Sequence, residues 1–153
     1  MIPALIILFV VAVALVPLVQ FAPSKRQREL AALRELAAVN GLFVEFREIP
    51  GRPEFRKHAG SDVGTIIYYG KRLPPGQREP RKPSHWVTHD GRWQAVGNWQ
   101  ALPEPVASLS MPLLAASVDD ESCGVYWVER DSTDEVEEIC QALTAWSEQL
   151  SHT

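Results

Sequence analysis

The sequence predicts an α+β fold: an N-terminal transmembrane helix followed by a small, mostly antiparallel sheet packed with two amphipathic helices. Three observations predict it. Residues 1–23 carry no charged side chain. Residues 24–40 and the residues after Ser132 repeat apolar side chains at a helical period. Short runs rich in β-branched and aromatic residues lie between these helices.

Residues 1–23 are the predicted membrane anchor. At about 1.5 Å per residue, the stretch from Ile2 to Phe21 crosses a hydrocarbon core of about 30 Å, and it has no polar face. A cleaved signal peptide would need a basic region before the apolar stretch and a small-residue cleavage site after it. No Lys or Arg precedes Ile2, and Ala22 is followed by Pro23. We expect a retained anchor, with a buried core helix of a soluble protein as the alternative.

Basic residues just after the anchor predict its orientation. Lys25, Arg26, Arg28 and Arg34 follow it, and basic flanks stay on the cytoplasmic side of a membrane. The N-terminus then faces outward, and residues 24–153 lie in the cytoplasm. The first three of these basic residues, Lys25, Arg26 and Arg28, are candidate contacts for lipid headgroups.

The chain divides into the anchor, a membrane-proximal amphipathic helix at 24–40 and a soluble α+β domain at 41–153. The roughly 130 residues after the anchor suit one domain with one core. Residues 1–92 carry 14 Lys and Arg against 8 Asp and Glu, whereas residues 93–153 carry 1 against 11. The excesses of +6 and −10 give the net charge of −4. This asymmetry fits attraction of the basic half to anionic lipid, and equally attraction between two halves of the domain.

The two cysteines, Cys123 and Cys140, are too few for a disulfide scaffold and lack the paired spacing of a zinc site. In a reducing cytoplasm both are expected to be thiols. Cys140 falls on the apolar face of a predicted helix. We therefore expect both cysteines to be buried and inert.

The membrane-proximal helix has clear start and stop signals. Ser24 is a good N-cap, and Gln27 follows at the capping-box spacing. Asn40 and Gly41 suit its end, because glycine readily takes the left-handed conformation found there. One apolar stripe along the helix contains Leu30, Leu33, Leu36 and Ala37. Such a helix either lies near the headgroups or packs on the domain.

About five strands are predicted. Residues 42–49 alternate and are rich in β-formers, residues 65–70 are apolar on both faces and hence central, and residues 123–130 form the last strand. Two more strands flank Asp90 and Gly91, which suit a two-residue type I′ turn.

The hairpin turn determines which side chains share a face. It sets the cross-strand pairs His89–Arg92, Thr88–Trp93 and Trp86–Ala95. One face, which we assign to the core, carries Trp86, Thr88, Trp93 and Ala95. The other face carries His85, Val87, His89, Arg92 and Gln94.

The remaining segments cover the sheet. Residues 101–117 are apolar but contain three prolines, so they cannot form one regular helix; a covering segment with a short helix fits them. The last helix begins after Ser132, which forms a second capping box with Glu135. Its apolar face carries Val136, Ile139, Cys140, Leu143, Trp146 and Leu150.

The sequence contains no constellation that demands a particular chemistry. His85 and His89 invite a metal interpretation, but residues four apart on a strand lie about 13 Å apart along the chain. They would meet only on a helix, which the hairpin turn disfavours. No nucleophile motif and no glycine-rich phosphate loop is present. We predict no catalytic residue, no metal and no cofactor, and hence a protein that is not an enzyme.

A basic loop at 71–83 is the best candidate for function. It contains four prolines and five basic residues, Lys71, Arg72, Arg78, Arg81 and Lys82. Proline keeps such a loop extended and low in entropy, ready to bind lipid phosphate or an acidic protein. The alternative is a solvated connector. Nucleic acid is not expected as a partner, because the chain is net acidic and the loop lacks aromatic residues.

The layout of the chain resembles a known family. A charge-free N-terminal span, SKRQRELAALRELAAVNGLFVEFREIP, a tryptophan hairpin and GVYWVER before an acidic helix follow one another. This layout is similar to small, uncharacterised single-pass proteins of gammaproteobacterial inner membranes, some labelled YajC-like translocase accessory subunits. YajC proteins are shorter and lack the tryptophan hairpin and the acidic terminal helix, and no functional residues carry over. The resemblance implies an inner-membrane location.

Two functions are expected. The first is a membrane-anchored accessory or scaffold protein, whose cytoplasmic domain binds a protein partner of a membrane complex and whose anchor lies in the lipid bilayer. The alternative is a small-ligand or lipid-headgroup sensor, with its pocket between the sheet and segment 101–117.

Overall fold

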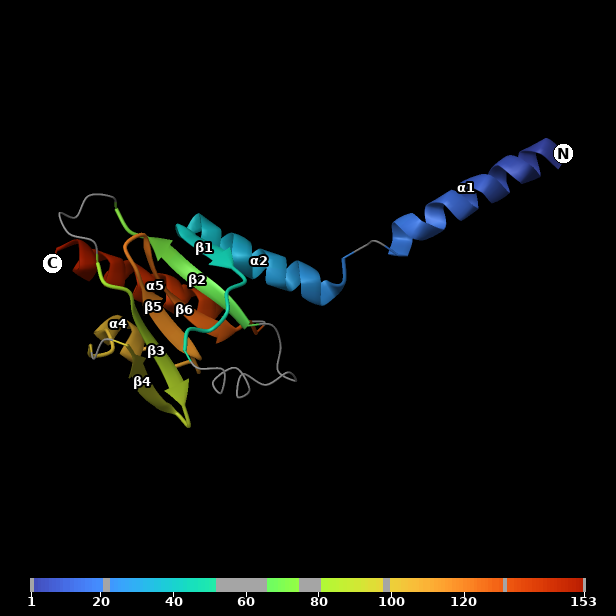
Figure 1. The fold of residues 1–153 in the computed structure, drawn as a ribbon. Coiled ribbons are helices and arrows are strands. Elements are labelled where there is room, and N and C mark those ends of the chain that lie inside the picture. Colours follow the sequence, from blue (N-terminus) through green and yellow to red (C-terminus); the bar gives the residue numbers. More distant parts are fainter. Residues whose placement is uncertain are drawn as a thin grey trace.

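A computed structural model describes residues 2–20, 23–51, 66–74, 81–97, 100–130 and 132–152. These residues form an α+β protein with a six-stranded antiparallel sheet and four helices (Figure 1). The helices are α1 (Ile2–Gln20), α2 (Lys25–Val39), α4 (Glu104–Ala107) and α5 (Thr133–Ser151). The strands are β1 (Leu42–Glu45), β2 (Ile66–Arg72), β3 (Ser84–His89), β4 (Arg92–Val96), β5 (Ala115–Val118) and β6 (Ser122–Val128), in the sheet order β1-β2-β6-β5-β3-β4.

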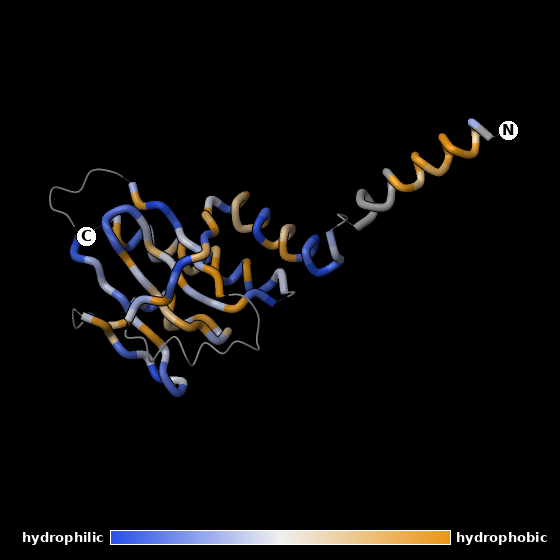
Figure 2. Tube along the Cα trace, turned by 45° about the vertical axis from the view of Figure 1, so that its right-hand side comes forward, coloured by the Kyte–Doolittle hydropathy of each residue, from blue (hydrophilic) through white to orange (hydrophobic). Residues whose placement is uncertain are grey.

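Helix α1 extends away from the rest of the structure (Figure 1), and the part of it that Figure 2 colours is mostly apolar. Its large apolar side chains between Leu5 and Val13 are 47–69% exposed. Among the described residues, no helix meets the length and the apolar character needed to span a membrane.

Helix α2 begins and ends at the predicted signals and packs on the sheet. The Ser24 hydroxyl accepts a bond from the Gln27 N–H (3.3 Å), while the Ser24 N–H donates to the Gln27 side chain (2.9 Å). Beyond the helix, Gly41 takes a φ of +78°. Leu33 and Ala37 are buried in the core. Of the two predicted positions for this helix, the structure therefore shows the one against the domain.

Helices α2, α4 and α5 cover one face of the sheet, which we call the helix face. Its strand residues alternate with those of the opposite, far face. The core on the helix face includes Ile67, Tyr69, Trp86, Val125, Trp127 and, from α5, Ile139, Leu143 and Trp146. A second, smaller core lies on the far face and contains Ile49, Tyr68, Val87, Ala115 and Tyr126. Both faces of the central strands are therefore buried.

The hairpin confirms the predicted turn and register. Asp90 and Gly91 have φ values of 49° and 73°, as a type I′ turn requires. The pairs are His89–Arg92, Thr88–Trp93 and Trp86–Ala95. Val87, predicted on the face away from the core, does lie there, but it is buried in the second core.

Three strand predictions were wrong in extent, and one strand was missed. The first strand ends at Glu45 instead of residue 49, and the last strand, predicted over 123–130, runs over Ser122–Val128. The missed strand is β5, whose first three residues were predicted as part of the covering segment 101–117; it forms because β3 and β6 offer it hydrogen-bonding partners on both sides. Strand β2 continues through Lys71 and Arg72, which were placed in the basic loop, because β6 pairs with them as far as Ser122.

Helix α5 has its predicted apolar face but only half of its predicted capping box. The Ser132 hydroxyl accepts a bond from the Glu135 N–H (3.4 Å). The Ser132 N–H donates to the carbonyl of Arg130 (2.8 Å) instead of to the Glu135 side chain. The predicted face, apart from half-buried Leu150, is buried.

A buried ion pair joins α2 to the sheet. Arg34 donates from Nε and Nη2 to the two carboxylate oxygens of Glu129 (3.0 and 2.6 Å). The Tyr69 hydroxyl donates to the same carboxylate (2.8 Å). The Glu129 side chain is 3% exposed and that of Arg34 34%. The hydrogen bond to Glu129 raises the pKa of Arg34, and burial raises the pKa of Tyr69, so both keep their protons and donate.

We predict that Arg34→Ala lowers the free energy of unfolding by about 3 kcal/mol, because it leaves the buried Glu129 carboxylate without its cation. The value is at the lower end of the usual range because Arg34 is partly exposed. Urea denaturation measures it. Lys25→Ala is the control, since it removes an exposed pair with Glu29 that contributes little. Equal stability of the two variants would contradict a structural role for the buried pair.

Candidate functional site

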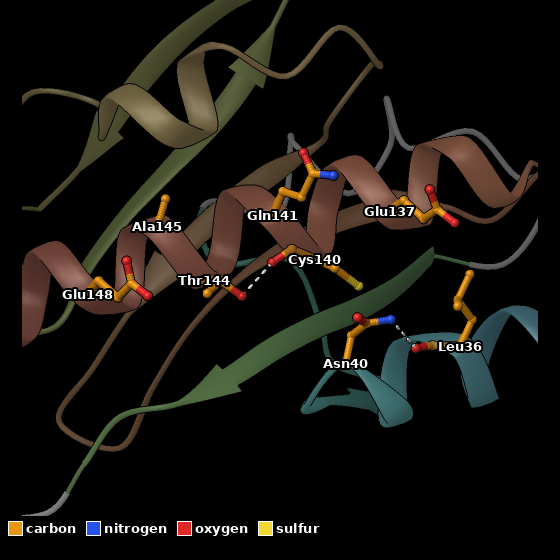
Figure 3. Close-up of a pocket in the computed structure, with 8 residues that line it drawn as sticks. All are labelled: Leu36, Asn40, Glu137, Cys140, Gln141, Thr144, Ala145 and Glu148. Carbon is orange, nitrogen blue, oxygen red and sulfur yellow. Dashed lines mark hydrogen bonds between the residues drawn. The ribbon is translucent and has the colours of Figure 1, made fainter.

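A groove of about 640 Å³ lies between α2 and α5 (Figure 3). Helix α2 contributes Leu36 and Asn40 to it. Helix α5 contributes Glu137, Cys140, Gln141, Thr144, Ala145 and Glu148. The α5 residues recur three and four apart, which places them on neighbouring turns of the helix. The groove exists because α2, held by Arg34, runs beside this face.

Lys71 lies against the groove from the strand beneath. The odd-numbered residues of β2 point to the helix face, and the Lys71 ammonium donates to the Thr144 hydroxyl (3.0 Å). That hydroxyl in turn donates to the carbonyl of Cys140 (2.7 Å). Among the groove's own lining residues, Glu137 and Glu148 carry charge. The groove therefore presents carboxylates, amides and a hydroxyl next to one cation, a lining suited to polar and charged groups of a partner.

Both cysteine side chains lie in surroundings that disfavour the thiolate. Both cysteines are free and buried, as predicted. Burial raises the pKa of the Cys123 thiol to about 12 and also raises that of Cys140. Since the thiolate is the nucleophile, the presence of Cys140 in the groove does not indicate nucleophilic catalysis.

The described residues form two further grooves, one of which adjoins the first. One, of about 540 Å³, separates α5 from α4 and the residues after it, and shares Gln141 and Ala145 with the first groove. The other, of about 550 Å³, lies between the β3–β4 hairpin and residues 100–102. Its lining includes Trp86 and Trp93, and the Trp86 indole N–H donates to the carbonyl of Gln100 (2.9 Å). It lies where the sequence places a pocket for a sensor, between the sheet and segment 101–117.

The predicted basic surface is divided by the fold. Lys71 faces α5, whereas Arg72 lies on the far face with its guanidinium 5.5 Å from the centroid of the Phe43 ring. Arg81 is half-buried; its guanidinium donates to the carbonyl of Leu150 (2.9 Å) and its backbone N–H to Asp120. Lys82 is exposed. Arg78 lies outside the described residues. Their role as one interaction surface stays a prediction.

The three candidate lipid contacts are exposed in the first turn of α2. Lys25 lies 3.5 Å from the Glu29 carboxylate, and Arg28 donates to the carbonyl of Pro23 (3.2 Å). Arg26 has no partner of this kind within the described part of the chain. Their contact with lipid headgroups stays a prediction.

The two histidines lie on the far face of β3. His89 is 3.3 Å from the Asp90 carboxylate, and Nδ1 of His85 is buried without a hydrogen bond in the described structure. Nowhere in the described ranges do three or more His, Cys, Asp or Glu side chains gather as a metal site would need.

Sequence reasoning missed the residues that line the groove along α5. Asn40 was assigned only to a helix stop, and Gln141, Thr144 and Glu148 to no role. The available signal was the polar side of α5, where these three recur at helical spacing. That signal alone does not say that another helix runs alongside.

Comparisons with known proteins leave the chain without a family assignment: no family model, no curated protein and no solved structure matches it. The resemblance to small inner-membrane proteins therefore rests on sequence layout and stays a prediction.

We predict that neither thiol reacts readily with iodoacetamide in the folded protein. At neutral pH, the rise in the Cys123 pKa from 9.0 to about 12 lowers its thiolate fraction about a thousandfold. Cys140, which lines the groove, should react first, and both should react quickly in urea. Mass spectrometry of timed samples measures the order. Faster labelling of Cys123 than of Cys140 would contradict this description of the groove.

Proposed function

We propose that this chain is a membrane-anchored, non-enzymatic accessory protein whose domain docks a partner of a membrane complex at the cytoplasmic side. The observation that carries the proposal is the exposed apolar helix α1, which precedes a helix fastened to a folded domain.

The exposure of α1 supports insertion into lipid. Side chains from Leu5 to Val13 leave a continuous apolar surface in contact with solvent, and exposed apolar patches larger than a few hundred Å² indicate interaction sites. Each Å² removed from water contributes about 25 cal/mol. The sequence stays free of charge through Phe21. The exposed basic residues at the start of α2 favour the cytoplasmic side for the domain.

The connection between α1 and the domain supports an accessory role. Two residues, Pro23 and Ser24, directly precede α2, and the capping box orders its first turn. The Arg34–Glu129 pair then fixes α2 on the sheet. An anchor attached to such a helix would hold the domain close to the bilayer, with the groove between α2 and α5 available to a neighbouring protein.

We predict that Leu8→Arg combined with Val11→Arg releases the full-length protein from membranes during carbonate extraction. An arginine near the centre of a membrane helix costs about 2.5–3.5 kcal/mol, so two should outweigh the apolar residues that remain. The matched control is Val39→Arg, which places the same charge on a residue of α2 that is 80% exposed and should leave the protein in the pellet.

Extraction of the unmodified protein into the soluble fraction would overturn the anchor. A reporter fused after Thr153 tests the orientation separately: activity restricted to the outer side of the membrane would overturn the cytoplasmic placement.

We predict that Gln141→Arg abolishes recovery of a stoichiometric partner when the tagged full-length protein is purified from its own membranes in mild detergent. Gln141 lines both grooves along α5, so a longer side chain obstructs either of them. Val39→Arg, a change at a residue that is 80% exposed and lines neither groove, is the control and should retain the partner. Quantitative mass spectrometry reports the ratio. Loss of the partner in both variants, or in neither, would count against docking along α5.

The tryptophan-lined groove supports a second candidate, a small-ligand sensor. Trp93 is half-buried in a groove of about 550 Å³, and aromatic linings are common in ligand sites. A screen of small metabolites for shifts in the melting temperature of the full-length protein tests it. The sensor function requires a shift that Trp93→Ala removes.

A further inference from the structure

A row of small residues crosses the far face of the sheet. Cross-strand pairing aligns Phe43 with Gly70, Gly70 with Gly124, Gly124 with Ser117, and Ser117 with His85. Directly paired residues share a face and lie about 5 Å apart. Three neighbouring positions in the middle of the row therefore carry no side chain or a very short one.

The ring of Tyr68 lies over the two glycines. A Cβ atom built on Gly70 would come within 2.5 Å of the Tyr68 ring, and one on Gly124 within 2.5 Å of the Tyr68 hydroxyl oxygen. The ring therefore starts on β2, crosses the Gly70–Gly124 pair and ends with its hydroxyl above β6. No side chain longer than that of glycine fits beneath it.

The Tyr68 hydroxyl has no hydrogen-bond partner within the described ranges, although the residue is 0% exposed. A buried polar group without a partner costs about 1–3 kcal/mol, and such groups are rare enough to need an explanation. Burial raises the pKa of Tyr68 to about 12, so the phenol stays protonated and can donate. The neighbouring hydroxyls of Ser122 and Ser117 act to lower that pKa, but neither forms a hydrogen bond of normal distance and angle with the phenol.

Two arginines lie near these hydroxyls. Arg72 is exposed, pairs across the sheet with Ser122 and has no carboxylate partner among the described residues. The Arg47 guanidinium lies 4.4 Å from the Tyr68 ring centroid and is paired with Glu45 (2.6 Å).

The Asp119 carboxylate lies next to Ser122 and already accepts hydrogen bonds. Oδ1 of Asp119 accepts the N–H groups of Glu121 and Ser122 and the Ser122 hydroxyl (2.9, 2.7 and 3.2 Å). Arg72 is therefore the cation left to balance an incoming anion.

We propose that a small oxyanion, the carboxylate or phosphate group of a ligand, binds on the far face beside Tyr68. It accepts hydrogen bonds from the hydroxyls of Tyr68 and Ser117, and Arg72 balances its charge, while the Ser122 hydroxyl keeps its bond to Asp119. Protonated hydroxyls and a guanidinium are donors that suit such a group. The site does not depend on the membrane role proposed above, because none of these residues lies in α1, in α2 or along α5.

The first test uses sodium phosphate and sodium acetate as probes. Each is added to the full-length protein in a neutral detergent, with sodium chloride adjusted to hold ionic strength constant, and the melting temperature is recorded. We expect at least one probe to raise it. Tyr68→Phe and Arg72→Gln should each weaken the apparent affinity about tenfold or more, as expected for the loss of a hydrogen bond to a charged group.

Two matched variants control for stability and for charge. Tyr69→Phe removes the neighbouring hydroxyl, which points to the helix face and bonds to Glu129; the protein should be less stable but keep its response to the probe. Arg92→Gln removes an exposed cation from the far face of β4 and should also keep it. In buffer without either probe, Tyr68→Phe should be at least as stable as the unmodified protein, because it deletes an unpartnered group.

An experiment with lipid distinguishes the two possible sources of such an anion, a lipid headgroup and a free ligand. Nanodiscs of phosphatidylcholine with phosphatidylglycerol, compared with phosphatidylcholine alone, supply the phosphate as a headgroup. A shift that depends on Tyr68 in this arm alone indicates a lipid, and one with the dissolved probes indicates a free ligand. The proposal is overturned if neither arm shifts the melting temperature, if Tyr68→Phe and Arg72→Gln respond like the unmodified protein, or if a high-resolution structure at saturating probe shows only water on the Tyr68 hydroxyl.

Discussion

The bidentate contact between Arg34 and Glu129 determines how the helices lie on the sheet. A carboxylate that is 3% exposed needs partners for both oxygens, and it finds them in Arg34 and the Tyr69 hydroxyl. Arg34 comes from α2 and Tyr69 from β2, and Glu129 directly follows β6. These hydrogen bonds therefore hold α2 and β2 next to the end of β6. The groove along α5 and the position of any anchor relative to the domain both follow from where α2 is held.

Local chemistry made much of the fold predictable from sequence. The hairpin register follows from Asp90 and Gly91 alone, because a two-residue turn leaves one pairing. Ser24 and Gln27 act within one turn, and the face of α5 follows from a 3.6-residue period. Strand β5 was missed because four small residues after a proline-rich stretch carry no strand signal of their own. It forms because β3 and β6 leave a gap in the sheet that only another strand fills.

The candidate sites were less predictable because they join residues far apart in the chain. Arg34 and Glu129 are separated by 95 positions, and nothing near either residue indicates the other. The basic run from Lys71 to Lys82 looked like one surface, yet alternation along β2 sends Lys71 to α5 and Arg72 to the far face. Gly70 and Gly124 were unremarkable as single glycines. Only the register of β2 and β6 shows that the two glycines lie side by side and make room for the Tyr68 ring.

The two faces of the sheet carry different candidate sites: the groove between α2 and α5 lies on the helix face, and the surroundings of Tyr68 lie on the far face. On the helix face, α2 follows the apolar helix in the sequence, supplies one partner of the buried ion pair and forms one wall of the groove. If α1 is the anchor proposed above, a protein bound in the groove would meet the domain beside it. The far face has a separate small core, in which the Tyr68 ring needs both glycines and leaves its hydroxyl unbonded. A sheet stabilised by packing alone would have no reason to bury that hydroxyl. Its burial next to Ser117 and Arg72, which has no carboxylate partner in the described part of the chain, is the feature of this fold that the proposed anion would explain.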